Sequence, residues 1–408
     1  MNNPKTLEAV AVLKYKDFRL FLIAKVCLTI AIQMQSVVLS WLIYQQTKNP
    51  LALGLIGLVE AIPALSIALF GGHLADRLSR RKLMIWSNVI TLIASVFIAG
   101  YVYQNTIIAT WPVYITIFLI GVARGFHAPA QAAFWGQLVP KNLYVNASSW
   151  NSSLWQIAAA IGPALGGLLY GTAGIFFALI LVCAFILVTI SCYMLIPDRH
   201  VIYNNVKESI SESLMKGVKF VFKNQFIISA ISLDLFAVLF GGAVALLPMF
   251  ADTILKTGPE GLGVLRAAPA VGSVLMAVLL AYYPPRQQAG YKMLLSVAAF
   301  GLCMIGFALS TSFYLSLLLL FLSGAFDNVS VVIRSTIIQG FTPDEMKGRV
   351  SAVNSIFVGS SNELGAFESG VMAKWMGLVP SVVFGGCMTL LVVGFTYLKA
   401  DKLKKLNL

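Results

Sequence analysis

The chain has 408 residues, of which 59% are hydrophobic and only 11% are charged. A soluble protein of this length has about a quarter charged residues, so the composition excludes an ordinary soluble domain and indicates many membrane spans. The net charge of +13 comes from cations distributed between apolar runs. Because no single basic arm exists, we expect no nucleic acid as a partner.

The apolar residues form runs that are long enough to cross a bilayer, for which about 20 residues are needed. We expect twelve transmembrane helices, near 18–45, 51–73, 83–104, 108–136, 144–171, 174–196, 225–251, 260–283, 291–310, 313–340, 347–373 and 379–399. If the chain crosses the membrane at each of these spans, most Lys and Arg residues fall in the termini and in the connections on the same side of the membrane as the termini. By the positive-inside rule, the sequence predicts a multi-pass protein of the cytoplasmic (inner) membrane with both termini cytoplasmic.

A short basic loop, residues 71–82, connects the second and third spans and reads Gly-Gly-His-Leu-Ala-Asp-Arg-Leu-Ser-Arg-Arg-Lys. A glycine here permits close approach of two helices, an acid can cap a helix N-terminus, and the arginines can reach acids on adjacent helices. We call these residues the cytoplasmic latch: Gly72, Asp76, Arg77, Arg80 and Arg81. The alternative is that the cations only set the topology, which explains their number but not the glycine and the acid.

The fifth span contains Ile-Gly-Pro-Ala-Leu-Gly-Gly at residues 161–167. Gly162, Gly166 and Gly167 build a face for tight helix packing, and Pro163 is expected to kink the helix. The alternative is a packing face without a specific role in transport.

A polar stretch at 197–224 divides the chain into an N-terminal six-helix bundle (1–196) and a C-terminal six-helix bundle with a short basic tail (225–408). Apolar residues at helical spacing within the stretch predict an amphipathic helix on the cytoplasmic membrane surface. The two halves align with each other, because 59–65 matches 265–271 and both Gly121–Gly324 and Pro140–Pro343 pair at one offset. This parallel repeat predicts two pseudo-symmetric bundles, with a substrate site between them near the midplane.

Charged residues inside the spans are the candidates for mechanism, since each costs about 2.5–3.5 kcal/mol or more without a partner. They are Lys25, Glu60, Arg124, Asp234, Arg266, Asp327, Arg334, Glu363 and Glu368. The repeat aligns Glu60 with Arg266 and Arg124 with Asp327, so equivalent positions carry opposite charges. Such residues are expected to meet or to share one aqueous cavity.

Polar residues extend these faces, because helical spacing places His127 on the same face as Arg124, and Gln33 on the same face as Lys25. The candidates for proton coupling or for lining the cavity are Glu60, Arg124, Asp327, Asp234, Arg334, Glu363, Lys25, Gln33 and His127. At least one acid is expected to carry the coupling proton, with Glu60 and Asp327 ranked first. The alternative for each charge is a static ion pair that fixes helix packing.

The loop at 71–82 resembles the loop between helices 2 and 3 of the major facilitator superfamily, where it helps to control alternating access. Ser79 departs from that pattern, in which a glycine is common. The motif at 161–167 resembles the helix-5 motif of the drug/proton antiporters in this superfamily, and 124–171 and 327–350 are similar to the branch that includes the enterobactin exporter. The resemblance covers essentially the whole chain and implies an all-α membrane protein with the major facilitator fold.

The resemblance further implies a secondary exporter that exchanges protons for an amphipathic small molecule, a drug or a siderophore, and acts as a monomer. The alternatives are an importer or a lysophospholipid transporter of the same fold, or a polytopic membrane protein that does not transport. We expect no enzyme activity, no cofactor and no metal site, with the proton gradient as the energy source. Neither the three histidines nor the five cysteines have the spacing of metal ligands, and a phosphate-binding loop for ATP is absent from the sequence.

Overall fold

The computed structural model describes residues 11–105, 108–198, 210–285, 287–400, 404 and 406, without the side chains of 68–77, 141, 145, 210–214 and 344. All regular secondary structure in these described ranges is helical. The chain forms two compact units. Unit 1 contains Met1–Gln46 and Val59–Val206, and unit 2 contains Thr47–Leu58 and Lys207–Leu408.

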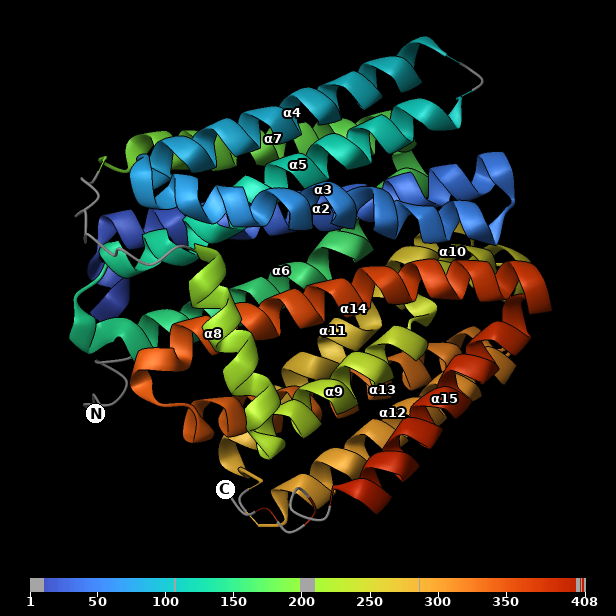
Figure 1. The fold of residues 1–408 in the computed structure, drawn as a ribbon. Helices are drawn as coiled ribbons and strands as arrows, with labels where there is room; N and C mark the ends of the chain where they lie inside the picture. Colours follow the sequence, from blue (N-terminus) through green and yellow to red (C-terminus); the bar gives the residue numbers. More distant parts are fainter. Residues whose placement is uncertain are drawn as a thin grey trace, which may run out of the picture. The chain divides into compact units, whose positions relative to one another are not determined.

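Unit 1 is built from long helices coloured blue to green in Figure 1. They are α2 (Lys16–Thr47), α3 (Pro50–Arg77, whose first residues belong to unit 2), α4 (Arg80–Gln104), α5 (Thr110–Phe134), α6 (Tyr144–Ala173) and α7 (Ile175–Leu195). Two buried clusters hold the unit together, one around Phe18, Phe21 and Phe134 and the other around Met34, Val182 and Ile186.

Unit 2 contains the remaining helices, coloured light green to red in Figure 1. They are α8 (Ile210–Lys223), α9 (Gln225–Phe240), α10 (Leu247–Met249), α11 (Gly258–Tyr282), α12 (Ala289–Leu309), α13 (Phe313–Phe341), α14 (Lys347–Met376) and α15 (Leu378–Lys399). Helix α8 forms inside the predicted amphipathic stretch, with Val221 fully buried. Its Gly217 packs against the backbone of Arg349 in α14, where a Cβ atom would lie 3.0 Å from the Arg349 carbonyl oxygen.

Eleven of the described helical segments are long and apolar enough to cross a membrane. The remaining predicted span, 347–373, coincides with α14, which has 30 residues and therefore reaches about 45 Å. Its hydropathy is lower because it contains Glu363, Glu368 and Lys374. The charges thus lie in a helix that is long enough to span the hydrocarbon core.

The predicted span 225–251 coincides with Gln225–Ile254, one of the segments long and apolar enough to cross a membrane, but it is not one continuous α-helix. Helix α9 ends at Phe240, and short helical turns lead on to Ile254. Gly241 and Gly242 follow α9 directly, and paired glycines favour such a break. The freed carbonyl of Gly242 accepts a hydrogen bond of 3.1 Å from Ser369 Oγ of α14, so the interruption is stabilised inside unit 2.

Candidate functional site

An ion pair joins α3 and α5 in unit 1. Arg124 Nη1 lies 2.7 Å from Glu60 Oε1, and the two side chains are 49% and 21% exposed. Gly121, one turn before Arg124, allows this approach, because a Cβ atom there would clash with the Glu60 carbonyl oxygen. The carboxylate is therefore held by a cation and remains partly accessible, an arrangement in which protonation would release the arginine.

A second ion pair lies in unit 2, between Asp234 of α9 and Arg334 of α13. These side chains are only 4% and 7% exposed, so both charges are removed from solvent. Removing one partner of such a pair leaves an uncompensated buried charge, which costs about 3–5 kcal/mol. The pair is therefore suited to holding α9 against α13.

The sequence identified the members of these two pairs but did not pair them with each other. The repeat alignment matched Glu60 with Arg266 and Arg124 with Asp327 across the two halves, whereas Arg124 meets Glu60 of its own unit. Asp327 is half-buried on α13. The neighbouring Asn328 donates a 2.8 Å hydrogen bond to Ser273 Oγ of α11.

His127 lies in a polar network of unit 1. Ser87 Oγ and Asn88 Nδ2 of α4 each lie 3.3 Å from its Nδ1, and Gln131 Nε2 lies 3.1 Å from its Nε2. Gln131 also donates to the hydroxyl of Tyr193 in α7, at 3.5 Å. The network joins α4, α5 and α7 through hydrogen bonds.

Lys25 of α2 donates to Asn151 of α6, with a distance of 2.6 Å to Oδ1 and 3.3 Å to the backbone oxygen. In both of these hydrogen bonds the acceptor of the ammonium group is a neutral oxygen and not a carboxylate. Gln33, two turns further along α2, packs against Gly162, where a Cβ atom would lie 2.6 Å from Gln33 Cβ. Both α2 candidates therefore contact α6.

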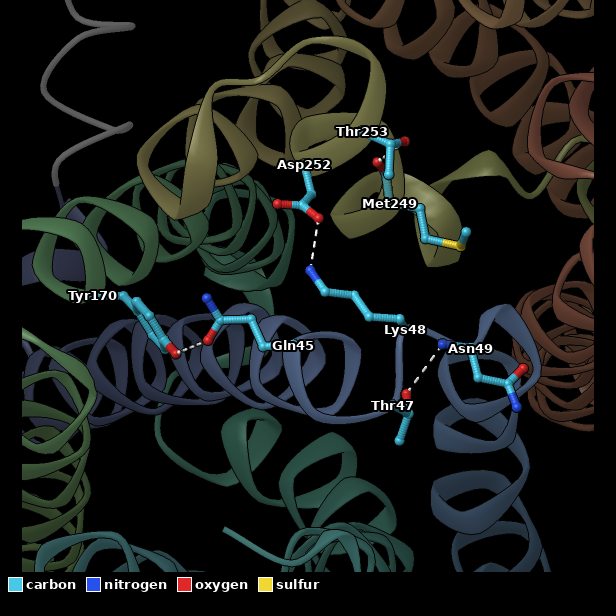
Figure 2. A network of polar contacts seen from close by, with 8 residues as sticks. All are labelled: Gln45, Thr47, Lys48, Asn49, Tyr170, Met249, Asp252 and Thr253. Atoms are coloured by element: carbon cyan, nitrogen blue, oxygen red, sulfur yellow. Dashed lines mark hydrogen bonds and ion pairs between the residues drawn. The ribbon is translucent and has the colours of Figure 1, made fainter. Parts of the chain in front are cut away.

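The glycines at 161–167 hold α6 against α2. A Cβ atom at Gly166 would lie 2.9 Å from Met34 Cα, while Gly167 and Pro163 are buried. Further along the same two helices, the Tyr170 hydroxyl donates to Gln45 Oε1 at 2.8 Å (Figure 2). The motif thus creates a close helix crossing within unit 1.

Only part of the cytoplasmic latch lies among the described side chains. Gly72, Asp76 and Arg77 fall outside them. Arg80 Nη1 donates to the Ala133 carbonyl at 2.8 Å. Arg81 donates to the carbonyls of Tyr193 and Met194 at 2.9 Å and 2.6 Å.

These arginine contacts lie at the ends of α5 and α7, where carbonyl groups lack partners within the helix and attract cations. The sequence predicted acids on adjacent helices as partners of Arg80, Arg81 and Lys82. These contacts of the two arginines are to backbone carbonyls, whereas Lys82 Nζ lies 4.0 Å from Asp198 Oδ2, just after α7.

Ser79, the departure from the family pattern, caps α4 by accepting from the Lys82 backbone N–H at 3.3 Å. Its hydroxyl also donates to Asp198 Oδ1 at 2.5 Å, just after α7. A glycine has no side chain for either contact. The serine therefore connects the loop to the residues that directly follow α7.

Residues 47–58 form a docked segment of unit 2. Lys48 Nζ lies 2.7 Å from Asp252 Oδ2, and Figure 2 shows the two side chains pointing toward each other. The glycines of α3 and α14 cross closely, because a Cβ atom at Gly54 would lie 3.0 Å from Gly370 Cα. Nothing in the sequence around Lys48 distinguishes it from other loop cations, so the sequence analysis did not predict its ion pair with Asp252.

Glu368 of α14 was counted among the intramembrane acids but not ranked as a candidate. Its Oε1 is buried and has no hydrogen-bond partner among the described residues. Glu363 lies on the same helix beside Gly57 of the docked segment, where a Cβ atom would lie 3.2 Å from its Oε2. The second unit therefore holds several acids in membrane-length helices.

The fold matches that of a solved structure. The chain superposes on the crystal structure of a D-xylose-proton symporter with a TM-score of 0.73, over 97% of this chain and 99% of that one, at 15% identity. The expected major facilitator fold is thereby confirmed.

A model of the transmembrane secretion effector family matches residues 7–407, and the chain belongs to that family of major facilitator transporters. The enterobactin exporter EntS of Shigella flexneri is 24% identical over 401 residues, which is 97% of this chain and 94% of the relative. The uncharacterized MFS-type transporter YfmI of Bacillus subtilis (strain 168) is 25% identical over 308 residues, 71% of this chain and 73% of the relative. The resemblance inferred from the motifs is confirmed.

Proposed function

We propose that this transporter is a proton-coupled exporter of an amphipathic small molecule, a siderophore or a drug. The observation that carries the proposal is the Glu60–Arg124 pair, a carboxylate and a cation that are held 2.7 Å apart within membrane-length helices and are partly exposed. The similarity to the enterobactin exporter EntS over 97% of the chain supports export and a siderophore-like substrate.

The ionised Glu60 would accept a hydrogen bond from a hydroxyl or cationic group of the substrate, with Arg124 beside it. Protonation of Glu60 from the opposite side of the membrane would neutralise the carboxylate and release the substrate there, and loss of that proton to the cytoplasm would restore the pair with Arg124. The proton and the substrate then exclude each other at Glu60, and this exclusion couples their movements in opposite directions. Coupling of this kind requires that each ligand has a different affinity in the two states.

The orientation belongs to the same proposal. By the positive-inside rule, we place both termini and the cations of the 71–82 loop and of α8, among them Arg80, Lys216 and Lys219, in the cytoplasm. The protein acts in the cytoplasmic membrane, as a monomer, with no cofactor beyond the proton gradient.

Everted membrane vesicles test the proposal, because an exporter accumulates substrate inside them when the lumen is acidic. Enterobactin, and ethidium in a parallel experiment, should be concentrated only in vesicles that contain the protein. Addition of either substrate should make the lumen more alkaline, and nigericin should abolish accumulation. Accumulation that survives nigericin would contradict proton coupling, and movement only out of the vesicles would indicate an importer.

A further inference from the structure

A cavity of about 490 Å³ lies between α9 and α15 on the surface of unit 2. The residues that matter here are Gln225, Ser229, Phe236, Phe240, Phe395 and Lys399. The side chain of Phe395 is 65% exposed and that of Phe236 is 42% exposed, so neither is fully covered by protein. We call this cavity the α9–α15 groove.

The groove has a polar end and an apolar end. Gln225 begins α9 and Lys399 ends α15, so an amide and an ammonium group line the same end of the groove. Phe236 and Phe240 lie further along α9, and their rings stack with centroids 6.5 Å apart. From Gln225 to Phe240, α9 rises about 22 Å, which exceeds half of the ~30 Å hydrocarbon core.

The charge at the polar end is positive. Lys399 makes no ion pair with a described residue. A second cation, the exposed Lys223, lies at the end of α8, just before Gln225 in the chain. Lysines next to the end of a membrane-spanning helix attract anionic lipid headgroups, while an apolar groove favours an acyl chain. The chemistry of the groove therefore matches an amphiphile with an anionic head and a long hydrocarbon chain.

We propose that the α9–α15 groove binds one anionic phospholipid, with its headgroup at Gln225 and Lys399 and an acyl chain along Phe236 and Phe240. Asn224 already caps α9, since its Oδ1 accepts from the N–H groups of Phe226 and Ile227, and the headgroup therefore relies on side chains. The groove is lined by residues of unit 2 only, whereas Glu60 and Arg124 belong to unit 1.

Purified full-length protein can be titrated with phosphatidylglycerol and phosphatidylcholine in native mass spectrometry. The parental protein should bind one phosphatidylglycerol more tightly than phosphatidylcholine. Lys399→Gln should weaken phosphatidylglycerol binding about fivefold and leave phosphatidylcholine binding unchanged. Lys292→Gln is the matched control, because Lys292 is an exposed cation near the start of α12 that does not line the groove.

A second variant fills the groove. Ser229→Trp should abolish the tight binding, and a monodisperse size-exclusion profile would show that the variant is folded. Glycerol phosphate should not displace the lipid, since it has no acyl chain. Equal binding of both lipids, equal losses in Lys399→Gln and Lys292→Gln, or displacement by glycerol phosphate would overturn the proposal.

A photoactivatable phosphatidylglycerol provides an independent readout. Its cross-links should map to peptides of α9 and α15, and Ser229→Trp should remove them. Cross-links that persist at the same peptides in Ser229→Trp would show adventitious lipid only.

Discussion

Lys48 and Asp252 form an ion pair of 2.7 Å although 204 positions separate them in the chain. The pair anchors the docked segment 47–58 to unit 2, together with the Gly54–Gly370 crossing. Lys48 has a φ of 47°, a left-handed conformation that a lysine rarely adopts, so the turn before α3 is held by its surroundings.

Reversal of this ion pair tests its contribution. Lys48→Asp and Asp252→Lys should each lower the melting temperature of the purified protein, and the double variant should recover most of the loss. Because the side chains are 56% and 35% exposed, the coupling energy should be only about 0.2–1 kcal/mol. A double variant no more stable than the single ones would show that the contact contributes nothing.

The buried Asp234–Arg334 pair should respond differently. Asp234→Asn or Arg334→Gln alone should destabilise unit 2 by about 3–5 kcal/mol, since the other charge stays buried. The double variant Asp234→Leu/Arg334→Met should recover stability. If the pair is static, the double variant should also transport, whereas stable protein without transport would assign it a role in coupling.

The close α2–α6 crossing predicts a strong effect of a small substitution. Gly166→Ala should destabilise the protein by about 1–3 kcal/mol, because its Cβ would lie 2.9 Å from Met34 Cα. Gly100→Ala on α4 is the matched control, with nothing within 4 Å of the added carbon. Similar melting temperatures for the two variants would contradict the crossing.

The cytoplasmic latch should affect turnover more than binding. Asp76→Asn and Arg80→Ala should slow transport while substrate affinity changes little, because the latch biases the conformational equilibrium without touching substrate. Transport rates and binding titrations on the same purified proteins measure both quantities. The interpretation fails if both variants transport at the parental rate.

The sequence alone predicts the helices well and their contacts poorly. Apolar run length is a local property, and it located the spans, including α14 despite Glu363 and Glu368. The break after Phe240 was missed, although Gly241 and Gly242 were a visible signal. A run of apolar residues does not show whether its helix is continuous.

The ion pairs show why the sequence does not predict which charged residues contact each other. Depth in the membrane follows from position in a helix, so Glu60 and Arg124 were recognised as intramembrane charges. Which charges meet depends on helix rotation and on crossings such as that at Gly121. A repeat alignment matches equivalent positions and does not report contacts, and it therefore gave no indication of the pair between α3 and α5.

The central claim is that Glu60 couples transport to protons, and one measurement on Glu60→Gln tests it. Everted vesicles with an acidic lumen should no longer concentrate enterobactin, while exchange down its own gradient should continue. Glu260→Gln, which changes an exposed acid at the start of α11, should transport as the parental protein does. Uphill accumulation by Glu60→Gln at the parental level would contradict the claim and leave Glu60–Arg124 as a structural pair.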